Sequence, residues 1–221
     1  MPLPDRHLDL GCGKFPRNPY ARGTLCGVDI RPLQASDAFD YRIANLSLQP
    51  IPWEDGSFGS VSAYDFIEHV PRLLADGHGG TRFPFIEVMD EVWRVLAPGG
   101  LFYALTPAYP HAAAFTDPTH VNIVTAETHE YFCGDAPMAR MYGFRGTFRA
   151  RRTEWVHIAD AYSAIPGSPE NRRPHTGLKR VARGLRTLSR RLRGIRPPPK
   201  LYLLWELEAI KPLPADGARN G

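Results

Sequence analysis

The chain has 221 residues, of which 43% are apolar, and its formal net charge is +4. This length and composition favour a single domain with one buried core and an appended segment. No apolar run reaches the roughly 18 residues of a membrane span, the N-terminus lacks a signal-peptide pattern, and the three cysteines lack zinc-ligand spacing. We therefore expect a cytoplasmic protein without a disulfide framework or a zinc site.

The first predicted element is a short buried strand that ends at Asp9 and is followed at once by Gly11 and Gly13. Two glycines directly after a strand indicate a turn where the backbone approaches a ligand closely. A second short strand, residues 26–30, carries Asp29 near its end. A glycine turn with a carboxylate about 20 residues later is how doubly wound α/β domains hold a nucleoside, whose ribose hydroxyls bind the carboxylate.

The same turn disfavours NAD and FAD. A dinucleotide site requires a third Gly or Ala three positions after the second glycine, so that a helix N-terminus can meet the pyrophosphate. Pro16 occupies that position. Only 12 residues separate Gly13 from Cys26, so we expect a single helical turn around residues 18–22, or a loop, instead of a full crossover helix.

Strands are next predicted at residues 41–46 and 59–65, with a proline-containing turn segment between them. A helix is predicted at residues 85–96, where apolar residues recur at spacings of three and four. The sequence Pro-Gly-Gly at residues 98–100 ends this helix, and a buried strand follows at residues 101–106.

These motifs, taken in order, resemble the class I S-adenosylmethionine-dependent methyltransferases (methyltransferase type 11-like). Residues 9–13 match D-x-G-x-G, residues 68–69 match the E-H pair that follows the fourth strand, and residues 96–100 match L-x-P-G-G. The resemblance covers residues 8–106. Asn45 stands where an Asp is usual, and it can still bind the adenine amine and ring nitrogen.

The resemblance implies an α/β fold with a Rossmann-like seven-stranded, mostly parallel sheet, an antiparallel final strand, helices on both faces and abbreviated first crossovers. It implies S-adenosyl-L-methionine as cofactor. Asp29 is expected to accept from both ribose hydroxyls, whereas Asp9 either holds the glycine loop or meets the cofactor's amino group through water. The residues that we expect at the cofactor are Asp9, Gly11, Cys12, Gly13, Asp29, Ile30, Asn45, Leu46 and Tyr64.

The segment after the fifth strand is expected to receive the acceptor, because ligands of such sheets bind beyond the carboxyl ends of the strands. Tyr109 and His111 lie at its start and are the predicted substrate-binding residues. Residues 117–120 read Asp-Pro-Thr-His, a sequence that recurs in bacterial methyltransferases related to those acting on sugars and small metabolites. A short helix capped by Thr125 is predicted through Phe132.

A hydroxyl acceptor holds its proton tightly, and neutral imidazole is suited to removing it. We therefore predict His120 as the first catalytic candidate, with Asp117 orienting the imidazole or acting itself. His69 is the next candidate, although its place after the fourth strand favours lining the pocket over catalysis. A solvated or structural histidine is the alternative in each case. No metal site is predicted, because none of these residues has ligand spacing.

Two late strands, at residues 147–157 and 201–210, are predicted to complete the sheet, so residues 1–221 form one domain. Residues 165–200 are then a basic, partly helical insertion between these strands. Residues 171–200 hold 11 lysines and arginines and no acid, which leaves the rest of the chain at −7. Leucines recur among these cations at helical spacing over 177–193.

Three interpretations of this basic helix remain open. The first, which we favour, is that the helix lies on an anionic membrane surface. The second is that it binds nucleic acid phosphates, and the third is that it packs its leucines on the domain. The predicted function is methyl transfer to a small-molecule or glycan acceptor, with oxygen as the favoured atom. A helix on the membrane would suit an acceptor that is linked to a lipid. The N/D-P-P-Y signature of amino-methylating enzymes is missing at residues 64–67. The alternatives are an RNA or protein methyltransferase that docks through the basic helix, and a non-catalytic cofactor-binding or membrane-recruited protein.

Overall fold

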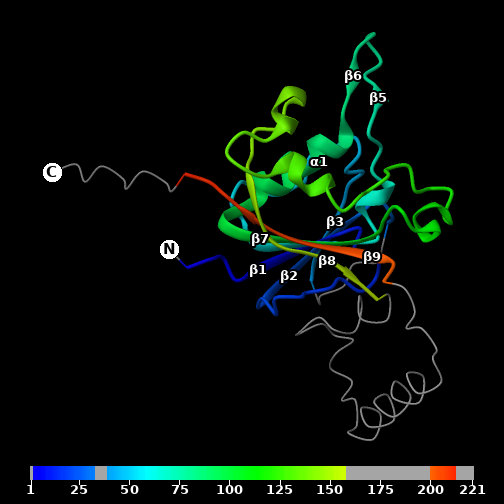
Figure 1. Ribbon diagram of the computed structural model, residues 1–221. Helices are drawn as coiled ribbons and strands as arrows, with labels where there is room; N and C mark the ends of the chain where they lie inside the picture. Colours follow the sequence, from blue (N-terminus) through cyan, green and yellow to red (C-terminus); the bar gives the residue numbers. More distant parts are fainter. Residues whose placement is uncertain (1, 33–38, 158–199, 213–221) are drawn as a thin grey trace, which may run out of the picture.

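The computed structural model describes residues 2–32, 39–157 and 200–212, which form one seven-stranded sheet with a small hairpin beside it (Figure 1). The strand order is β3-β2-β1-β4-β7-β9-β8. Neighbouring strands are parallel, except that β9 runs antiparallel to both β7 and β8. The strands of the sheet are β1 (Arg6–Leu10), β2 (Thr24–Asp29), β3 (Asp40–Ile43), β4 (Phe58–Tyr64), β7 (Leu96–Pro107), β8 (Phe148–Val156) and β9 (Tyr202–Ala209). The hairpin consists of β5 (Leu74–Ala75) and β6 (Thr81–Arg82). The predicted seven-stranded, mostly parallel sheet is confirmed.

Strand β1 is the point at which the strand order reverses. It pairs with β2 on one side and with β4 on the other, and both pairings are parallel. Its residues from position 7 to position 10 are all buried. Because ligands of open α/β sheets bind at such a switch point, the turn that follows β1 is where the fold itself predicts a site.

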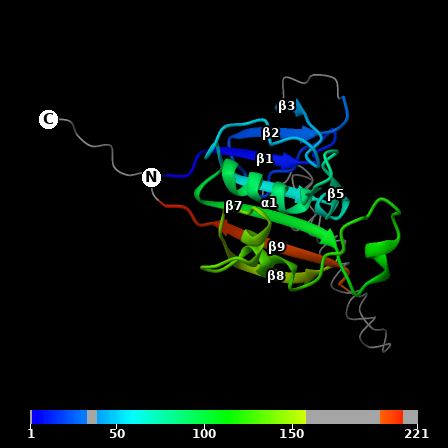
Figure 2. The ribbon, with the colours of Figure 1, turned by 90° about the horizontal axis from the view of Figure 1, so that it is seen from above.

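One face of the sheet is covered by α1 (Pro84–Val95), which lies over the central strands (Figures 1 and 2). A proline at its first position favours the helical start, and the chain leaves the helix directly into β7. Met89 and Val92 are fully buried on its inner side, and Phe102 of β7 belongs to the same apolar core. The predicted helix is confirmed to within one residue at each end.

The opposite face is covered by the loop after β1, so the second of the two expected connections is correct. Asn18 and Arg22 close a turn with two bonds between the Asn18 amide and the Arg22 backbone, and no helix forms. The Tyr20 ring packs 6.3 Å from that of Tyr103, which alternates with the α1-facing residues of β7. Among the described residues, α1 is thus the one α-helix. The loop after β1 takes the place of a helix on the other face of the sheet.

The remaining helical segments are short 3₁₀ turns: η1 (Ile67–His69), η2 (Ala112–Phe115), η3 (Thr128–Phe132) and η4 (Met138–Tyr142). The short helix predicted through Phe132 is a 3₁₀ turn over Thr128–Phe132, and the Thr125 hydroxyl, the predicted cap, accepts the Glu127 amide at 3.3 Å just before it. No helix in the described ranges has the length and apolar composition needed to cross a bilayer. Most of the predicted insertion, including residues 177–193, lies outside these ranges and stays a prediction.

Candidate functional site

The glycine turn after β1 is closed against the end of β2. Gly11 and Gly13 have φ angles of +62° and +56°, a region that side chains disfavour. A Cβ atom on Gly11 would lie 2.8 Å from the Phe66 ring. The amide of Gly13 donates to Oδ2 of Asp29 at 2.9 Å. The turn therefore needs glycine for its conformation and for the space beside Phe66.

Asp29 is a buried carboxylate held in its charged form. Arg31 donates to it from its backbone amide and from two guanidinium nitrogens, at 2.9–3.0 Å. Burial alone would raise the pKa of Asp29, but the bonds from Arg31 and Gly13 outweigh it and lower that pKa below its usual value. A ribose that binds here therefore meets an ionised acceptor whose oxygens are shared with Arg31.

A cavity of about 410 Å³ opens beside Asp29. Of the predicted cofactor residues, those that line it are Gly11, Asp29, Ile30, Asn45 and Leu46. It thus offers glycine backbone, a carboxylate and an amide within one hollow of ligand size. This set fits the nucleoside and amino acid parts of S-adenosylmethionine without any phosphate-binding group.

The other predicted cofactor residues lie around this cavity without lining it. The Cys12 thiol is directed at Gly27, where an added Cβ would approach it to 2.6 Å, and the Tyr64 ring packs 5.5 Å from that of Tyr103. Asp9 accepts the Arg17 amide at 2.8 Å, so it performs the first of its two expected roles and holds the loop after the glycines.

Asp9 belongs to a buried hydrogen-bond network with Ser62, Ser60 and His7. The Ser62 hydroxyl donates to Asp9 at 2.5 Å, and the two ring nitrogens of His7 each lie 2.8 Å from a serine hydroxyl, that of Ser60 or Ser62. Burial, together with the charge of Arg22, lowers the pKa of His7 to about 3. His7 is therefore a neutral hydrogen-bonding residue within the sheet.

A second cavity, of about 600 Å³, adjoins the first. Both cavities are lined by Asp65 and His69, so they meet at these two side chains. The second cavity is also lined by Asp117 and His120. The structure thus brings together all three predicted catalytic residues and places them directly beside the cofactor cavity.

Backbone bonding between two distant segments creates this cluster. The amides of Val121 and Asn122 both donate to the carbonyl of Glu68 at 2.9 Å. The buried Asn122 amide group donates to the Ile67 carbonyl at 3.0 Å. These bonds fix the loop that carries His120 onto η1, and the two histidine rings lie 4.8 Å apart.

The hydrogen bonds of both histidines define their tautomers. His120 Nδ1 lies 3.0 Å from the Ala114 carbonyl, which can only accept, so the proton resides on Nδ1. His69 Nδ1 lies 3.3 Å from the Thr119 carbonyl and 3.0 Å from its hydroxyl, which itself donates to Asp117. Both rings therefore donate from Nδ1, so Nε2 is the nitrogen that carries the lone pair in the neutral form of each ring.

Two acidic residues of this region were not predicted as site residues. Glu68 is 1% exposed, and burial raises its pKa to about 8. Asp65 follows β4 with a φ of +46°, and burial raises its pKa as well. By contrast, the bonds from Thr119 lower the pKa of the exposed Asp117. The E-H pair at residues 68–69 was the available signal, of which only the histidine was used.

The two predicted substrate-binding residues are placed differently from expectation. Tyr109 is 53% exposed, and the His111 ring packs 5.0 Å from Trp155. Neither residue lines the second cavity, which we call the histidine cavity because His69 and His120 line it. Residues 112–116, which follow them, include the η2 turn that contributes to its wall. Acceptor binding by Tyr109 and His111 therefore stays a prediction without a place in this cavity.

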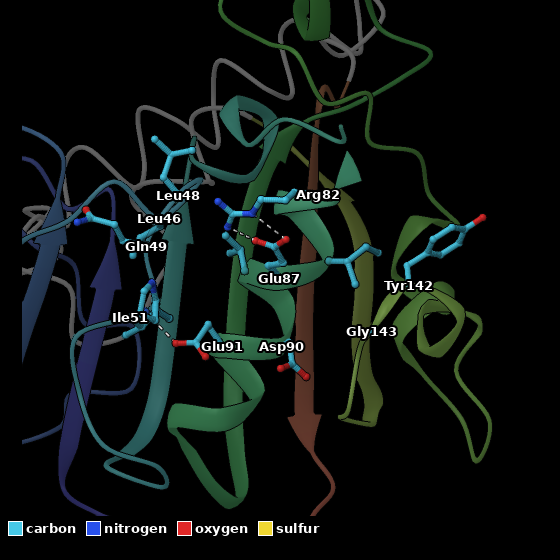
Figure 3. A pocket seen from close by; sticks show the side chains of 13 residues that line it. Leu46, Leu48, Gln49, Ile51, Arg82, Glu87, Asp90, Glu91, Tyr142 and Gly143 are labelled. Atoms are coloured by element: carbon cyan, nitrogen blue, oxygen red, sulfur yellow. Dashed lines mark hydrogen bonds and ion pairs between the residues drawn. The ribbon is translucent and has the colours of Figure 1, made fainter. Parts of the chain in front are cut away.

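A third hollow, of about 430 Å³, lies beside α1, between that helix, residues 46–51 and Tyr142 (Figure 3). Its charged groups are already paired: Glu87 with Arg82, and Glu91 with the Ile51 amide at 2.9 Å. It contains none of the predicted catalytic residues. We therefore place the chemistry at the two adjoining cavities.

The fold is a Rossmann-like domain whose candidate site lies at the reversal point of its sheet, where such folds bind ligands. The fold resembles that of solved structures, although sequence identity is low. A chain in the complex of the Haloferax volcanii Trm112 methyltransferase activator with a putative methyltransferase is 18% identical, with a TM-score of 0.53, covering 96% of this chain and 86% of that one. The [4+2]-cyclase SpnF is 16% identical, with a TM-score of 0.50 and coverages of 95% and 76%.

Residues 8–104 match the family described as "Methyltransferase domain". No curated protein matches the chain. Together with the glycine turn, Asp29 and the reversal at β1, this match supports a methyltransferase domain of the class I S-adenosylmethionine-dependent kind over residues 8–104. S-adenosylmethionine is its cofactor.

Proposed function

We propose that the enzyme transfers the methyl group to a hydroxyl oxygen of a small-molecule or glycan acceptor. The observation that supports this most is the second cavity, where His69, His120 and Asp117 meet at the edge of the cofactor cavity. An unprotonated amine can react without such a group, whereas an aliphatic hydroxyl needs help to lose its proton. The polar lining also suits the hydroxyls of a sugar.

The chain's own residues divide the work as follows. When bound, S-adenosylmethionine supplies an electrophilic methyl group. Asp29 and the glycine turn hold the ribose and the amino acid part at the first cavity. His120 presents the lone pair of Nε2 to the acceptor, because the Ala114 carbonyl holds the proton on Nδ1. Asp117, whose Oδ2 lies 4.0 Å from His120 Nε2, passes the proton to solvent. Proximity of the two ligands supplies much of the rate.

The test is turnover with a panel of sugars, small alcohols, amines and a structured RNA, followed by release of S-adenosylhomocysteine and by product mass spectrometry. An O-methyl product from a hydroxyl compound supports the proposal. N-methylated or RNA products would refute the assignment of the acceptor. Absence of turnover with every compound, despite cofactor binding, would favour the non-catalytic alternative.

We also propose that residues 177–193 hold the enzyme at an anionic membrane surface, where a lipid-linked glycan acceptor would be available. This proposal depends on the sequence alone, because these residues lie outside the described ranges. Sedimentation with anionic and neutral vesicles tests it: retention on anionic vesicles only, reversed by salt, is expected. Equal binding to RNA would instead support docking to nucleic acid.

A further inference from the structure

Three potential metal-ligating side chains converge between the two cavities. One ligand atom from each of Glu68, His69 and His120 lies within 4.8 Å of the other two. In tetrahedral or octahedral sites with bonds of about 2.1 Å, neighbouring ligands stand roughly 3–3.5 Å apart. The cluster therefore needs to close only by about 1–2 Å, and two of its members lie on short turns rather than within the sheet.

The hydrogen bonds of the two imidazoles are those of metal ligands. Metal-bound histidines almost always donate their other ring N–H to a carbonyl, carboxylate or water, which orients the ring. His120 donates from Nδ1 to a backbone carbonyl, and His69 donates from Nδ1 to Thr119. Both Nε2 atoms keep a free lone pair, and no hydrogen bond to either is present in the described part of the chain.

Glu68 is a second, independent observation that points to a ligand at this cluster. Glu68 is 1% exposed; its carboxyl group interacts with the Thr106 hydroxyl and its own backbone amide, but neither oxygen has a partner with full hydrogen-bond geometry among the described residues. A buried carboxyl group without partners is costly, and most such groups in folded proteins are satisfied by a bond or an ion. Its oxygens belong to the same cluster as the two imidazoles.

We propose that Glu68, His69 and His120 bind a divalent first-row transition-metal ion at the junction of the two cavities. Two imidazoles and one carboxylate form a donor set suited to Zn²⁺, Fe²⁺, Mn²⁺ or Co²⁺, whereas Mg²⁺ and Ca²⁺ prefer oxygen ligands alone. Three protein ligands leave coordination positions open toward the second cavity, as in catalytic rather than structural metal sites.

The role of the ion rests on the proposed function, whereas its binding does not. An acceptor hydroxyl at an open position of the ion would have a lowered pKa. Its proton would leave through Asp117 to water, the new oxygen–carbon bond would form, and the electron pair of the broken carbon–sulfur bond would stay on sulfur. In that arrangement His120 activates the hydroxyl through the ion instead of accepting its proton directly.

Cobalt(II) titration of the chelator-treated, reduced protein tests the site without any acceptor. The wild type is expected to bind one equivalent, with visible d–d absorption typical of mixed nitrogen and oxygen ligation. The isosteric change Glu68→Gln, and separately His120→Ala, should each weaken binding by about 100-fold. His78→Ala, which removes an exposed histidine in the β5–β6 hairpin, is the matched control and should bind as the wild type does.

Each outcome decides a different point. No saturable Co²⁺ binding by the wild type, or equal binding by wild type and Glu68→Gln with both folded by circular dichroism, would overturn the site. Binding of Co²⁺ together with methylation that chelators do not reduce would support the site and overturn its role in activation. Binding of Co²⁺ without any O-methyl product from the acceptor panel would leave the site standing and refute the proposed acceptor.

Discussion

The two adjoining cavities are built in different ways. The cofactor cavity is formed at the ends of adjacent parallel strands, where Gly11, Asp29 and Asn45 each follow or end one strand. The histidine cavity is formed where η1 meets a loop about 50 residues later, through bonds to the Glu68 carbonyl. The first depends on sheet register and the second on loop packing, so a substitution in one should leave the other intact.

The largest expected effect is that of Asp29→Ala on cofactor affinity. It removes a charged acceptor of the ribose hydroxyls, and hydrogen bonds to charged groups contribute about 1.5–3 kcal/mol each. Calorimetric titration should show the dissociation constant of S-adenosylhomocysteine rise by about 100-fold or more. Asp117→Ala, at the other cavity, is the matched control and should change it less than about twofold. Equal losses for both variants would show that the cavities are not independent.

The reverse experiment is His120→Ala. We expect kcat to fall by about 100-fold, because the group that activates the acceptor is lost. The dissociation constant of S-adenosylhomocysteine should stay within about twofold of the wild type, since His120 does not line the cofactor cavity. Steady-state kinetics and calorimetry on the same preparation check both values. Wild-type kcat in this variant would remove His120 from the chemistry.

Asn122→Ala tests whether loop packing assembles the histidine cavity. The buried Asn122 side chain donates to the Ile67 carbonyl and accepts from Arg72 at 2.7 Å. Its loss should release the loop that carries His120 and lower kcat by about 10–30-fold, without contact between Asn122 and the acceptor. Thr125→Val, a change in the same chain segment, should have a much smaller effect.

A readout beyond activity separates this positioning role from a general loss of structure. Cofactor affinity and the thermal midpoint of the domain report on the sheet, whereas hydrogen exchange of the residue 121 and 122 amides reports on the loop. We expect faster exchange at these two amides alone, because both donate to the Glu68 carbonyl. Slow exchange together with reduced kcat would contradict the positioning role.

The same difference explains what the sequence could and could not predict. Strand periodicity, glycine turns and a carboxylate at a strand end are local patterns, and they predicted the sheet, α1 and five of the residues lining the cofactor cavity. Nothing local predicts that residue 120 returns to residue 68, because that contact depends on long-range backbone bonds. Hence the sequence predicts the catalytic histidines one by one, and their spacing along the chain carries no information on the cluster that they form with Glu68.

Side-chain direction was the other limit of the sequence. Cys12 and Tyr64 occupy motif positions, but alternation along β4 turns the Tyr64 ring to the face that Tyr20 covers. The place of His111 after the fifth strand does not predict its ring contact with Trp155 of β8, which links two segments more than 40 residues apart. The burial of Glu68 became visible only with the loop in place.

The smallest expected effect is a change in the pH dependence of stability on substitution of His7. The His7 ring hydrogen-bonds with two serine hydroxyls, one of which donates to Asp9. The pKa of His7 is about 3 in the folded chain, against 6.5 as its ordinary value. Between these values the unfolded chain binds a proton that the folded chain does not, so stability falls as pH falls below about 6.5. From pH 7 to pH 5.5 this loss of unfolding free energy amounts to about 1 kcal/mol.

His7→Gln keeps hydrogen-bonding capacity but cannot titrate, so its unfolding free energy in urea should decline less over that interval. Parallel pH profiles for the two proteins would show that His7 is charged, or solvated, in the folded state. Because the histidine cavity shares no member of this network, kcat at saturating cofactor should follow the same pH profile in both proteins.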